Sequence, residues 1–426
     1  MNLEIVTIGD ELLLGFTIDT NAAHLARELA ALGIRVVRRA TVGDSADVIA
    51  SAVEEALQRT GAVITTGGLG PTADDRSKPS IAALFAREMV LDPDILAALE
   101  TRWHKRFGHA LPISNRQQAL IPEGATILHN RHGSAPGIWL EDAQGRWVAM
   151  LPGVPREMRG MLADTLLPVL RSRSPDDGPV VRSRTLRTAN IAESALADRL
   201  GDLAGGVLGL PLAFLPGRDG VDLRLTSHAL PADATERVLT EAATLVRAKV
   251  ARYVYGEGDD DLAALILREC ASRAYTIAVA ESCTGGLLGS RFTAVPGSSA
   301  VFLGGTIAYS NDVKVRELGV AAHDIAVHGA VSEPVAVAMA TGVRQSFGSQ
   351  VGIGITGIAG PDGGTPEKPV GTVWVAVDVA GDVHAVRTVF PGDRNEIRYR
   401  ATQMALDRVR RVFNHDQDSV AWMARS

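Results

Sequence analysis

Two hydroxyls and a thiol stand together where an apolar segment gives way to glycine, in the run Ser282, Cys283, Thr284, Gly285 and Gly286. The preceding residues 275–280 are apolar and β-branched, which is typical of a buried strand, and the apolar spacing after the glycines is helical. A strand-to-helix turn presents a side chain at the carboxyl edge of a sheet, beside free amides of the helix start. It can therefore hold a nucleophile and stabilise an oxyanion. The alternative is that these residues only cap a helix.

A hydroxyl nucleophile needs a base, and no Ser-His-Asp arrangement can be assigned around Ser282. Tyr309 and Lys314 lie at another strand end of the same predicted sheet. A lysine whose charge is disfavoured by burial and by nearby arginines can deprotonate a serine, with the tyrosine relaying or orienting. The ordinary alternatives are half-buried packing for Tyr309 and a solvated helix start for Lys314. Cys283 is a rival nucleophile or a small buried residue, and its position favours Ser282 instead.

Groups that can bind a phosphate follow in the same half of the chain. A strand at 351–356 runs into a Gly-rich loop, and a helix at 395–413 carries several arginines. Amides of such a loop cradle an anion, and an arginine can clamp a phosphate with two hydrogen bonds. We therefore expect a hydrolase of a small phosphate-bearing molecule. Beside the turn residues Thr284, Gly285 and Gly286, its candidate binding residues are Thr356, Gly357, Gly360, Arg394 and Arg398.

Acidic and glycine-rich runs also follow two predicted strands near the N-terminus, at 3–8 and 62–66. The carboxyl ends of parallel strands form the ligand-binding edge of such sheets. There, glycine amides can approach phosphate oxygens while carboxylates hold a hard divalent cation. The alternative is a tight turn before an acidic helix start. The candidate residues are Asp10, Glu11, Gly67, Gly68, Gly70, Thr72, Asp74 and Asp75, of which Asp10, Asp74 and Asp75 are the candidate metal ligands.

The order of strands and helices predicts an α/β protein of three parts. Strands alternate with helices over 1–170 and again over 260–413, which predicts two α/β sandwich domains with mainly parallel sheets. Between them, 178–255 has a βαββα pattern that predicts a small α+β domain. We expect residues 92–125 to be helical and residues 171–179 to form a boundary.

Composition restricts the function classes. The 426 residues are 46% hydrophobic and 22% charged, as in ordinary globular proteins. A net charge of −6 and 4% aromatic residues argue against a nucleic-acid partner. Two cysteines argue against a disulfide framework. The sequence starts with a strand-like segment rather than a signal peptide and has no bilayer-length apolar run. We expect a cytoplasmic protein with no membrane partner, by default a homodimer.

Several ordered motifs in residues 1–170 resemble the molybdopterin-binding-like domain of the competence/damage-inducible protein CinA family. They are GDELLLG, TTGGLGPTADD, NRQQALIPEGA, NRHGSAPG and LPGVPREM. The resemblance implies hydrolysis of ADP-ribose-like pyrophosphates with a divalent metal, or pterin binding as in related molybdenum-cofactor proteins. It does not say which carboxylates bind the metal. The family has a KH-like domain at 178–255. The predicted helix Glu236–Lys249 has mixed charge, which favours a spacer or dimer scaffold over RNA binding.

The motifs of 260–413 are similar to the C-terminal CinA domain, the nicotinamide mononucleotide (NMN) amidohydrolase family. They are AESCTGG, AYSNDVK, HGAVSEPV, GITGIAGPDGG, KPVGTVW and PGDR. The resemblance implies conversion of NMN to nicotinate mononucleotide and ammonia, with Ser282 as nucleophile, Tyr309 and Lys314 assisting, and no metal. Together the two resemblances predict a bifunctional pyridine-nucleotide hydrolase. The alternatives are a cofactor-binding protein or a non-enzymatic partner in competence or DNA damage.

Overall fold

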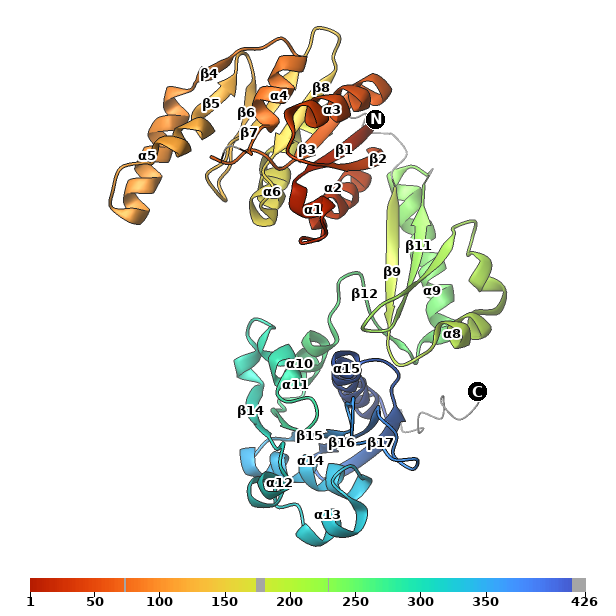
Figure 1. Cartoon of the computed structure of the whole chain (residues 1–426). Coiled ribbons are helices and arrows are strands. Elements are labelled where there is room, and N and C mark those ends of the chain that lie inside the picture. The colour runs from red at the N-terminus through yellow and green to blue at the C-terminus, as the bar shows by residue number, and fades with distance from the viewer. Residues whose placement is uncertain (73, 174–180, 229, 416–426) are drawn as a thin grey trace. The chain divides into compact units, whose positions relative to one another are not determined.

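The computed structural model describes residues 1–72, 74–173, 181–228 and 230–415 (Figure 1). The chain divides into two compact units, Met1–Arg182 with Ser227–Arg237 and Ser183–Thr226 with Val238–Ser426. The boundary predicted at 171–179 falls mostly outside the described residues. None of the described helices combines the length and apolarity needed to cross a membrane.

A six-stranded mixed sheet in the order β2-β1-β3-β8-β7-β6 forms the centre of the first unit. The strands are β1 (Asn2–Ile8), β2 (Arg35–Val42), β3 (Ala62–Thr66), β6 (Thr126–Leu128), β7 (Gly137–Glu141) and β8 (Trp147–Leu151). β1 is parallel to β2 and β3, and β3 is parallel to β8, whereas β7 and β6 run antiparallel. The carboxyl ends of β1 and β3 therefore share one edge of the sheet, as the sequence predicts.

Helices cover both faces of this sheet (Figure 1). The helices of this unit are α1 (Asp10–Leu13), α2 (Thr20–Ala31), α3 (Ala46–Thr60), α4 (Ser77–Leu84), α5 (Pro93–Phe107), α6 (Pro155–Met161) and α7 (Leu167–Arg173). On β1, Ile5 packs in one apolar cluster with Leu25 of α2, and Val6 packs in another with Val53 of α3. Central strands buried on both faces explain the nearly continuous apolar runs in the sequence.

The helix predicted over 92–125 is wrong beyond Phe107. Gly108 has φ 74 and takes the left-handed conformation that ends α5. A 3-10 segment, Ile113–Ala119, and the strand β5 (Leu120–Pro122) follow, and β5 pairs with β4 (Met89–Leu91). The polar residues after α5 therefore form a connection instead of a continued helix.

The middle part of the chain is a four-stranded sheet in the order β10-β11-β9-β12. Its elements are β9 (Arg182–Thr188), α8 (Glu193–Leu200), β10 (Leu212–Pro216), β11 (Val221–Ser227), α9 (Ala232–Val250) and β12 (Val254–Glu257). The predicted βαββα pattern is confirmed, with one further strand. The predicted hairpin is closed by a 2.8 Å hydrogen bond from the amide of Gly217 to the carbonyl of Gly220.

The C-terminal sheet has the order β14-β13-β15-β16-β17. Its strands are β13 (Ile277–Glu281), β14 (Phe302–Ile307), β15 (Val351–Gly357), β16 (Thr372–Val379) and β17 (Asp382–Val389). Only β14, β13 and β15 are parallel, because β16 and β17 return antiparallel. No helix lies in the connection from β15 to β16, whereas a parallel return usually runs through a crossover helix. The sheet is therefore more mixed than expected.

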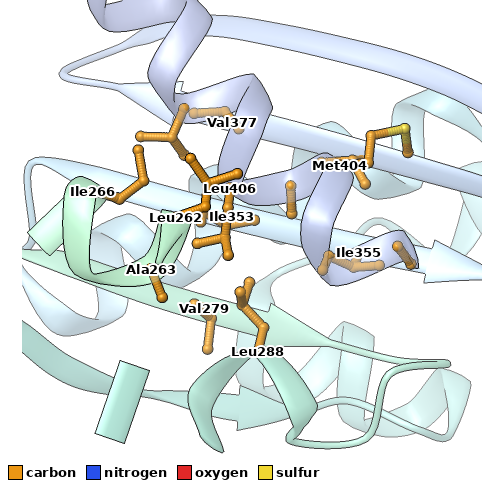
Figure 2. Close-up of a cluster of buried hydrophobic side chains, with 14 of the residues drawn as sticks. Leu262, Ala263, Ile266, Val279, Leu288, Ile353, Ile355, Val377, Met404 and Leu406 are labelled. Atoms are coloured by element: carbon orange, nitrogen blue, oxygen red, sulfur yellow. The ribbon is translucent and has the colours of Figure 1, made fainter. Parts of the chain in front are cut away.

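Helices again lie on both faces. They are α10 (Leu262–Ser272), α11 (Leu287–Thr293), α12 (Asn311–Leu318), α13 (Ala322–His328), α14 (Glu333–Phe347) and α15 (Arg394–Phe413). Figure 2 shows α10, α11 and α15 meeting the sheet, where Leu262, Leu288 and Leu406 belong to one buried cluster with Val279 and Ile353. This cluster anchors the two helices, α11 and α15, that flank the turn after β13.

Candidate active sites

Ser282 lies directly after β13, where three parallel strands end. Its amide donates to the carbonyl of Ile355 on β15 at 3.0 Å, and the amide of Ala308, after β14, donates to the carbonyl of Glu281 at 2.8 Å. Gly285 and Gly286 follow with φ 58 and φ 91, so the sharp turn needs glycine at both positions. The turn therefore has the place in the sheet that the sequence predicts.

The sequence predicted that free amides at the start of α11 stabilise an oxyanion. This prediction is wrong, because those amides already donate hydrogen bonds within the protein. The buried carboxylate of Glu281 accepts hydrogen bonds from the amides of Gly286, Leu288 and Gly289 at 3.0, 3.1 and 2.8 Å. The amide of Gly285 is also occupied, by the carbonyl of Ser282 at 3.1 Å. The position of Glu281 immediately before the turn was the sequence signal that could have predicted this cap.

Two amides of the turn remain available to an oxyanion. In the described part of the chain, the amides of Cys283 and Thr284 donate to no other residue, although the amide of Cys283 contacts its own thiol. The side chain of Thr284 is fully buried, and its hydroxyl has no partner there. The candidate oxyanion donors are therefore the amides of the turn itself, one or two residues after Ser282, and not those of the helix that follows.

Lys314 is buried beside this turn and is not the solvated residue of the alternative interpretation. Its side chain is 1% exposed, and its ammonium donates to the carbonyls of Ala308 at 2.9 Å and Tyr309 at 3.4 Å. Burial lowers the pKa of Lys314, against the opposing electrostatic effect of Cys283. A lysine with a lowered pKa next to a serine turn has the properties of a general base.

Cys283 has the properties of a buried structural thiol. It is 6% exposed, and burial raises the pKa of its thiol to about 12. A Cβ atom added to Gly357 would lie 3.1 Å from its sulfur, so the thiol packs against the end of β15. A thiol that stays protonated at neutral pH is a poor nucleophile.

Tyr309 is exposed and is not packed in the core. Its side chain is 64% exposed, and its hydroxyl accepts a 3.1 Å hydrogen bond from Arg394 at the start of α15. Arg394 also donates to the carbonyl of Gly360 at 2.7 Å. This arginine therefore connects α15 to the segments that follow β14 and β15. The predicted residues Tyr309, Gly360 and Arg394 thus lie together.

Arg398 reaches the turn itself. Its guanidinium donates to the carbonyl of Thr284 at 2.8 Å. The hydroxyl of Thr356, by contrast, donates to the carbonyl of Ala330 at 2.8 Å and so serves the fold. Besides the unpartnered hydroxyl of Thr284, the side chains of Arg394 and Arg398 retain further donors among the expected phosphate-binding groups.

A cavity of about 520 Å³ lies at the carboxyl edge of the N-terminal sheet. It brings together Glu11, Gly67, Gly68, Gly70, Asp74 and Asp75, whereas Asp10 and Thr72 are not among its lining residues. The sequence prediction missed Asp44, Gln118, Ser134 and Glu157, which also line it. Asp44 had a signal, because Gly43-Asp44 follows β2 as Gly9-Asp10 follows β1.

The conformation of the glycine-rich loop depends on a close contact between two strand ends and on hydrogen bonds to Asp75. A Cβ atom on Gly67 would lie 2.2 Å from the carbonyl oxygen of Ile8, so only glycine lets the two strand ends meet. The carboxylate of Asp75 accepts from the amides of Gly70 and Thr72 at 2.7 and 2.8 Å and from the hydroxyl of Thr72. Asp75 therefore holds the loop, and the amide of Gly70 is not left for an anion.

Carboxylates dominate the cavity without forming a ready-made metal site. The carboxylate of Asp44 accepts from the backbone amide of Asp10 at 3.1 Å, and the carboxylate of Asp10 accepts from the backbone amide of Asp44 at 3.4 Å. Burial raises the pKa of Asp44, and the charges of Asp10, Glu11 and Asp74 act in the same direction. Among the residues described, no three His, Cys, Asp or Glu are arranged to hold a metal ion. The donors are hard oxygens that suit Mg²⁺, which proteins commonly bind through one or two carboxylates plus substrate phosphates.

Three family models match the chain in order. The "Probable molybdopterin binding domain" matches residues 4–172, the "Damage-inducible protein CinA KH domain" matches 183–256, and the "CinA C-terminal domain" matches 259–413. The two candidate sites fall in the first and the last of these ranges.

Similar proteins carry the same family name. A "CinA-like protein" of Gemmatimonas aurantiaca is 74% identical over 427 residues, covering 100% of both chains. A "Putative competence-damage inducible protein" of Moorella thermoacetica is 44% identical over 410 residues, covering 95% of this chain and 97% of its own. A CinA superfamily crystal structure from Klebsiella pneumoniae is 34% identical, covers 36% of this chain and 96% of its own, and has a TM-score of 0.35. The chain therefore belongs to the CinA family of competence/damage-inducible proteins.

Proposed function

We propose that residues 260–413 hydrolyse the carboxamide of NMN to nicotinate mononucleotide and ammonia. The observation that carries this proposal is the burial of Lys314, with a lowered pKa, beside the turn that presents Ser282. From α15, Arg398 donates to the carbonyl of Thr284 in the same turn and Arg394 donates to the carbonyl of Gly360 after β15, and both supply cationic donors for a substrate phosphate. A serine, a base and an anion clamp are the groups that amide hydrolysis of a nucleotide needs.

The reaction proceeds in two steps. Ser282 attacks the carboxamide carbon while the neutral amine of Lys314 takes the hydroxyl proton. Lys314 returns that proton to the leaving nitrogen as the C–N bond breaks, so ammonia departs and an ester remains on Ser282. Water then cleaves the ester to give the carboxylate product and the free serine. The amides of Cys283 and Thr284 are available to the oxyanion of both steps.

Tyr309 acts in this proposal as a positioning group at the mouth of the site. Its exposed hydroxyl is held by Arg394, so it can orient the substrate or relay a proton. Tyr309→Phe should lower kcat less than Ser282→Ala does, because the base and the nucleophile remain. Measurement of ammonia release by both variants tests this order, and equal losses would give Tyr309 a role in proton transfer itself.

We propose that residues 1–170 hydrolyse ADP-ribose-like pyrophosphates with a divalent metal of unidentified type. Support comes from a cavity of about 520 Å³ with the glycine-rich loop on its wall. Among the described residues that line the cavity, none is Lys or Arg, whereas four are acidic: Glu11, Asp44, Asp74 and Asp75. A pyrophosphate would meet only negative charge there, and a divalent ion bound with it supplies the neutralising charge. Incubation with ADP-ribose and Mg²⁺ should give AMP and ribose 5-phosphate, and no turnover with any divalent ion would contradict this.

Pterin binding is a second candidate for the same cavity. It is favoured by the description of the matching family model, "Probable molybdopterin binding domain". Calorimetric titration with molybdopterin distinguishes the two functions. Tight binding without hydrolysis of ADP-ribose would favour a cofactor-handling protein over a pyrophosphatase.

A further inference from the structure

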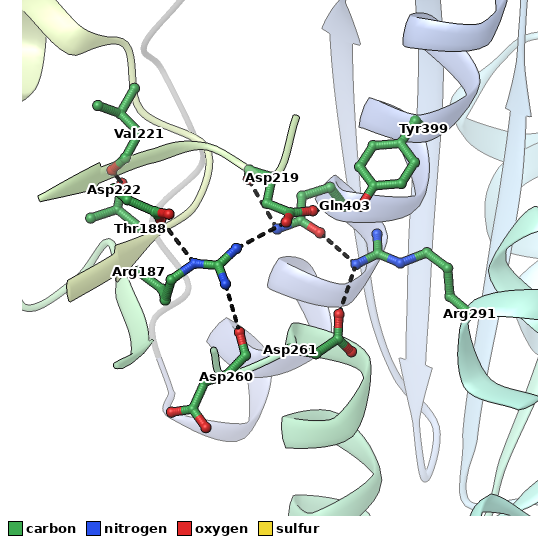
Figure 3. A network of polar contacts seen from close by, with 10 residues as sticks. All are labelled: Arg187, Thr188, Asp219, Val221, Asp222, Asp260, Asp261, Arg291, Tyr399 and Gln403. Carbon is green, nitrogen blue, oxygen red and sulfur yellow. Dashed lines mark hydrogen bonds and ion pairs between the residues drawn. The ribbon is translucent and has the colours of Figure 1, made fainter. Parts of the chain in front are cut away.

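The turn between β10 and β11 of the middle domain contacts α15 of the C-terminal domain (Figure 3). The carboxylate of Asp219 accepts a 2.6 Å hydrogen bond from the hydroxyl of Tyr399. The backbone carbonyl of Asp219 accepts a second one, from the side-chain amide of Gln403 at 3.0 Å. Tyr399 and Gln403 are four residues apart and so lie on one face of the helix. One residue of the middle domain therefore holds two successive turns of α15.

Asp219 is itself fixed by the middle domain. Arg187 on β9 donates to Asp219 at 2.9 Å, to Asp222 at 2.9 Å and to the backbone carbonyl of Asp260 at 3.2 Å. The next residue, Gly220, lies so close to β9 that a Cβ atom would be 2.0 Å from the carbonyl oxygen of Thr188. The turn thus packs closely against β9 and is fixed by hydrogen bonds from the guanidinium of Arg187. It therefore gives α15 a rigid contact surface.

The same helix carries the arginines of the candidate site. Arg394 and Arg398 occupy the first two turns of α15 and donate to the carbonyls of Gly360 and Thr284. Arg291 on α11 donates to the side chain of Gln403 at 2.8 Å, so the second helix beside the turn is tied to the same point. A shift of α15 at Tyr399 would therefore displace Arg398, its immediate neighbour in sequence.

We propose that Asp219 is a positioning residue for the phosphate-binding arginines, and that the middle domain sets substrate affinity in the C-terminal domain by holding α15. The inference rests on the proposed NMN hydrolysis for its substrate. It assigns the middle domain a role in presenting a phosphate-bearing nucleotide, in addition to that of a spacer. Ser282 and Lys314 lie on other elements, so their chemistry should depend less on this contact.

The test separates KM from kcat in the full-length protein. Asp219→Ala and Tyr399→Phe each remove the short hydrogen bond, and we expect either to raise KM for NMN by about three- to tenfold with kcat within about twofold. The double variant should raise KM no further than the stronger single variant, because both changes remove one interaction. Wild-type KM in both single variants, or an equal fall in kcat, would overturn the proposal.

Asp222→Ala is the matched control. Asp222 binds the same Arg187, but among the described residues it has no hydrogen bond to α15. It should keep KM within about twofold of wild type, and a rise as large as that of Asp219→Ala would show a general loss of middle-domain structure.

Hydrogen exchange supplies a readout that does not need activity. Exchange in the peptide 394–403 should increase in Asp219→Ala and stay unchanged in Asp222→Ala. If the wild-type protein releases no ammonia from NMN, the proposed reaction fails while this comparison still decides the coupling. Unchanged exchange in Asp219→Ala would overturn it.

Discussion

The carboxylate of Glu281 accepts a 2.8 Å hydrogen bond from the backbone amide of Gly289, across the turn that carries Ser282. Two further amides, of Gly286 and Leu288, donate to the same side chain. A strand residue thus caps the following helix from outside, and the positive end of α11 is neutralised by a buried anion. The position of Ser282 is therefore set by its neighbour in sequence as well as by the sheet.

Glu281→Gln should lower both stability and activity. The glutamine side chain places an NH₂ group against backbone donors, so at least one amide of the turn loses its acceptor. We expect a loss of about 1–3 kcal/mol in the free energy of unfolding and a fall in kcat of at least about tenfold as the turn relaxes. Glu333→Gln, at the exposed first turn of α14, is the control and should change neither quantity. Wild-type kcat in Glu281→Gln would show that the cap does not position Ser282.

The pH dependence of kcat should report Lys314. Burial lowers the pKa of Lys314 below its ordinary value of 10.5, and only the neutral amine can accept the proton of Ser282. The rate should therefore rise with pH and become constant above the lowered pKa. Lys314→Arg keeps the charge but cannot act as a base at these pH values, so it should be inactive throughout. A rate independent of pH in the wild type would argue for a different base.

A second buried lysine makes a prediction about stability. Lys78 of α4 donates to the carbonyls of Gln117 and Gln118 at 2.7 and 3.2 Å, and burial lowers its pKa to about 8. Between pH 8 and 10.5 the unfolded chain holds more protons at this residue, so its contribution to stability rises with pH. The difference is about 3 kcal/mol over that interval.

Lys78→Met provides the reference for this measurement. The free energy of unfolding in urea is compared for both proteins at pH 7.5 and pH 10. The free energy of unfolding of the wild type should increase relative to that of the variant as pH rises. A constant difference between the two proteins would mean that Lys78 keeps its ordinary pKa in the fold.

Metal removal should separate the two proposed activities. EDTA should abolish hydrolysis of ADP-ribose, because the pocket carboxylates cannot bind a pyrophosphate without a neutralising cation. Ammonia release from NMN should continue unchanged, since Ser282, Lys314 and the arginines contain every group that the proposed step uses. Product analysis of one preparation with both substrates makes this comparison. Loss of both activities would contradict a metal-independent amide hydrolysis.

Local sequence patterns predicted the main elements of the fold. The strand before Ser282, the strand before the glycine-rich loop and the β10–β11 hairpin are all present, because apolar runs bounded by glycine are strong local signals. Sheet direction was harder to predict. The direction of β16 depends on the path of its connection, which contains no crossover helix, and not on the residues of the strand itself.

The site was predicted less completely, because hydrogen-bond partners are not encoded locally. The sequence predicted that Ser282 and Lys314 lie near strand ends of one sheet, but not that Glu281 occupies the helix amides. It identified the acidic residues near Gly70, but not that Asp75 is used to hold the loop while Asp44 joins the cavity from β2. Such pairings depend on which strand ends meet, which the fold decides.

Ammonia release from NMN by the wild type, Ser282→Ala and Cys283→Ala proteins tests the central proposal most directly. The buried thiol is expected to be dispensable, so Cys283→Ala should keep kcat within about tenfold of wild type, whereas Ser282→Ala should lose at least about a thousandfold. Nicotinate mononucleotide should accumulate in step with ammonia. Activity that survives in Ser282→Ala, or that is lost only in Cys283→Ala, would contradict the assignment of Ser282 as the nucleophile.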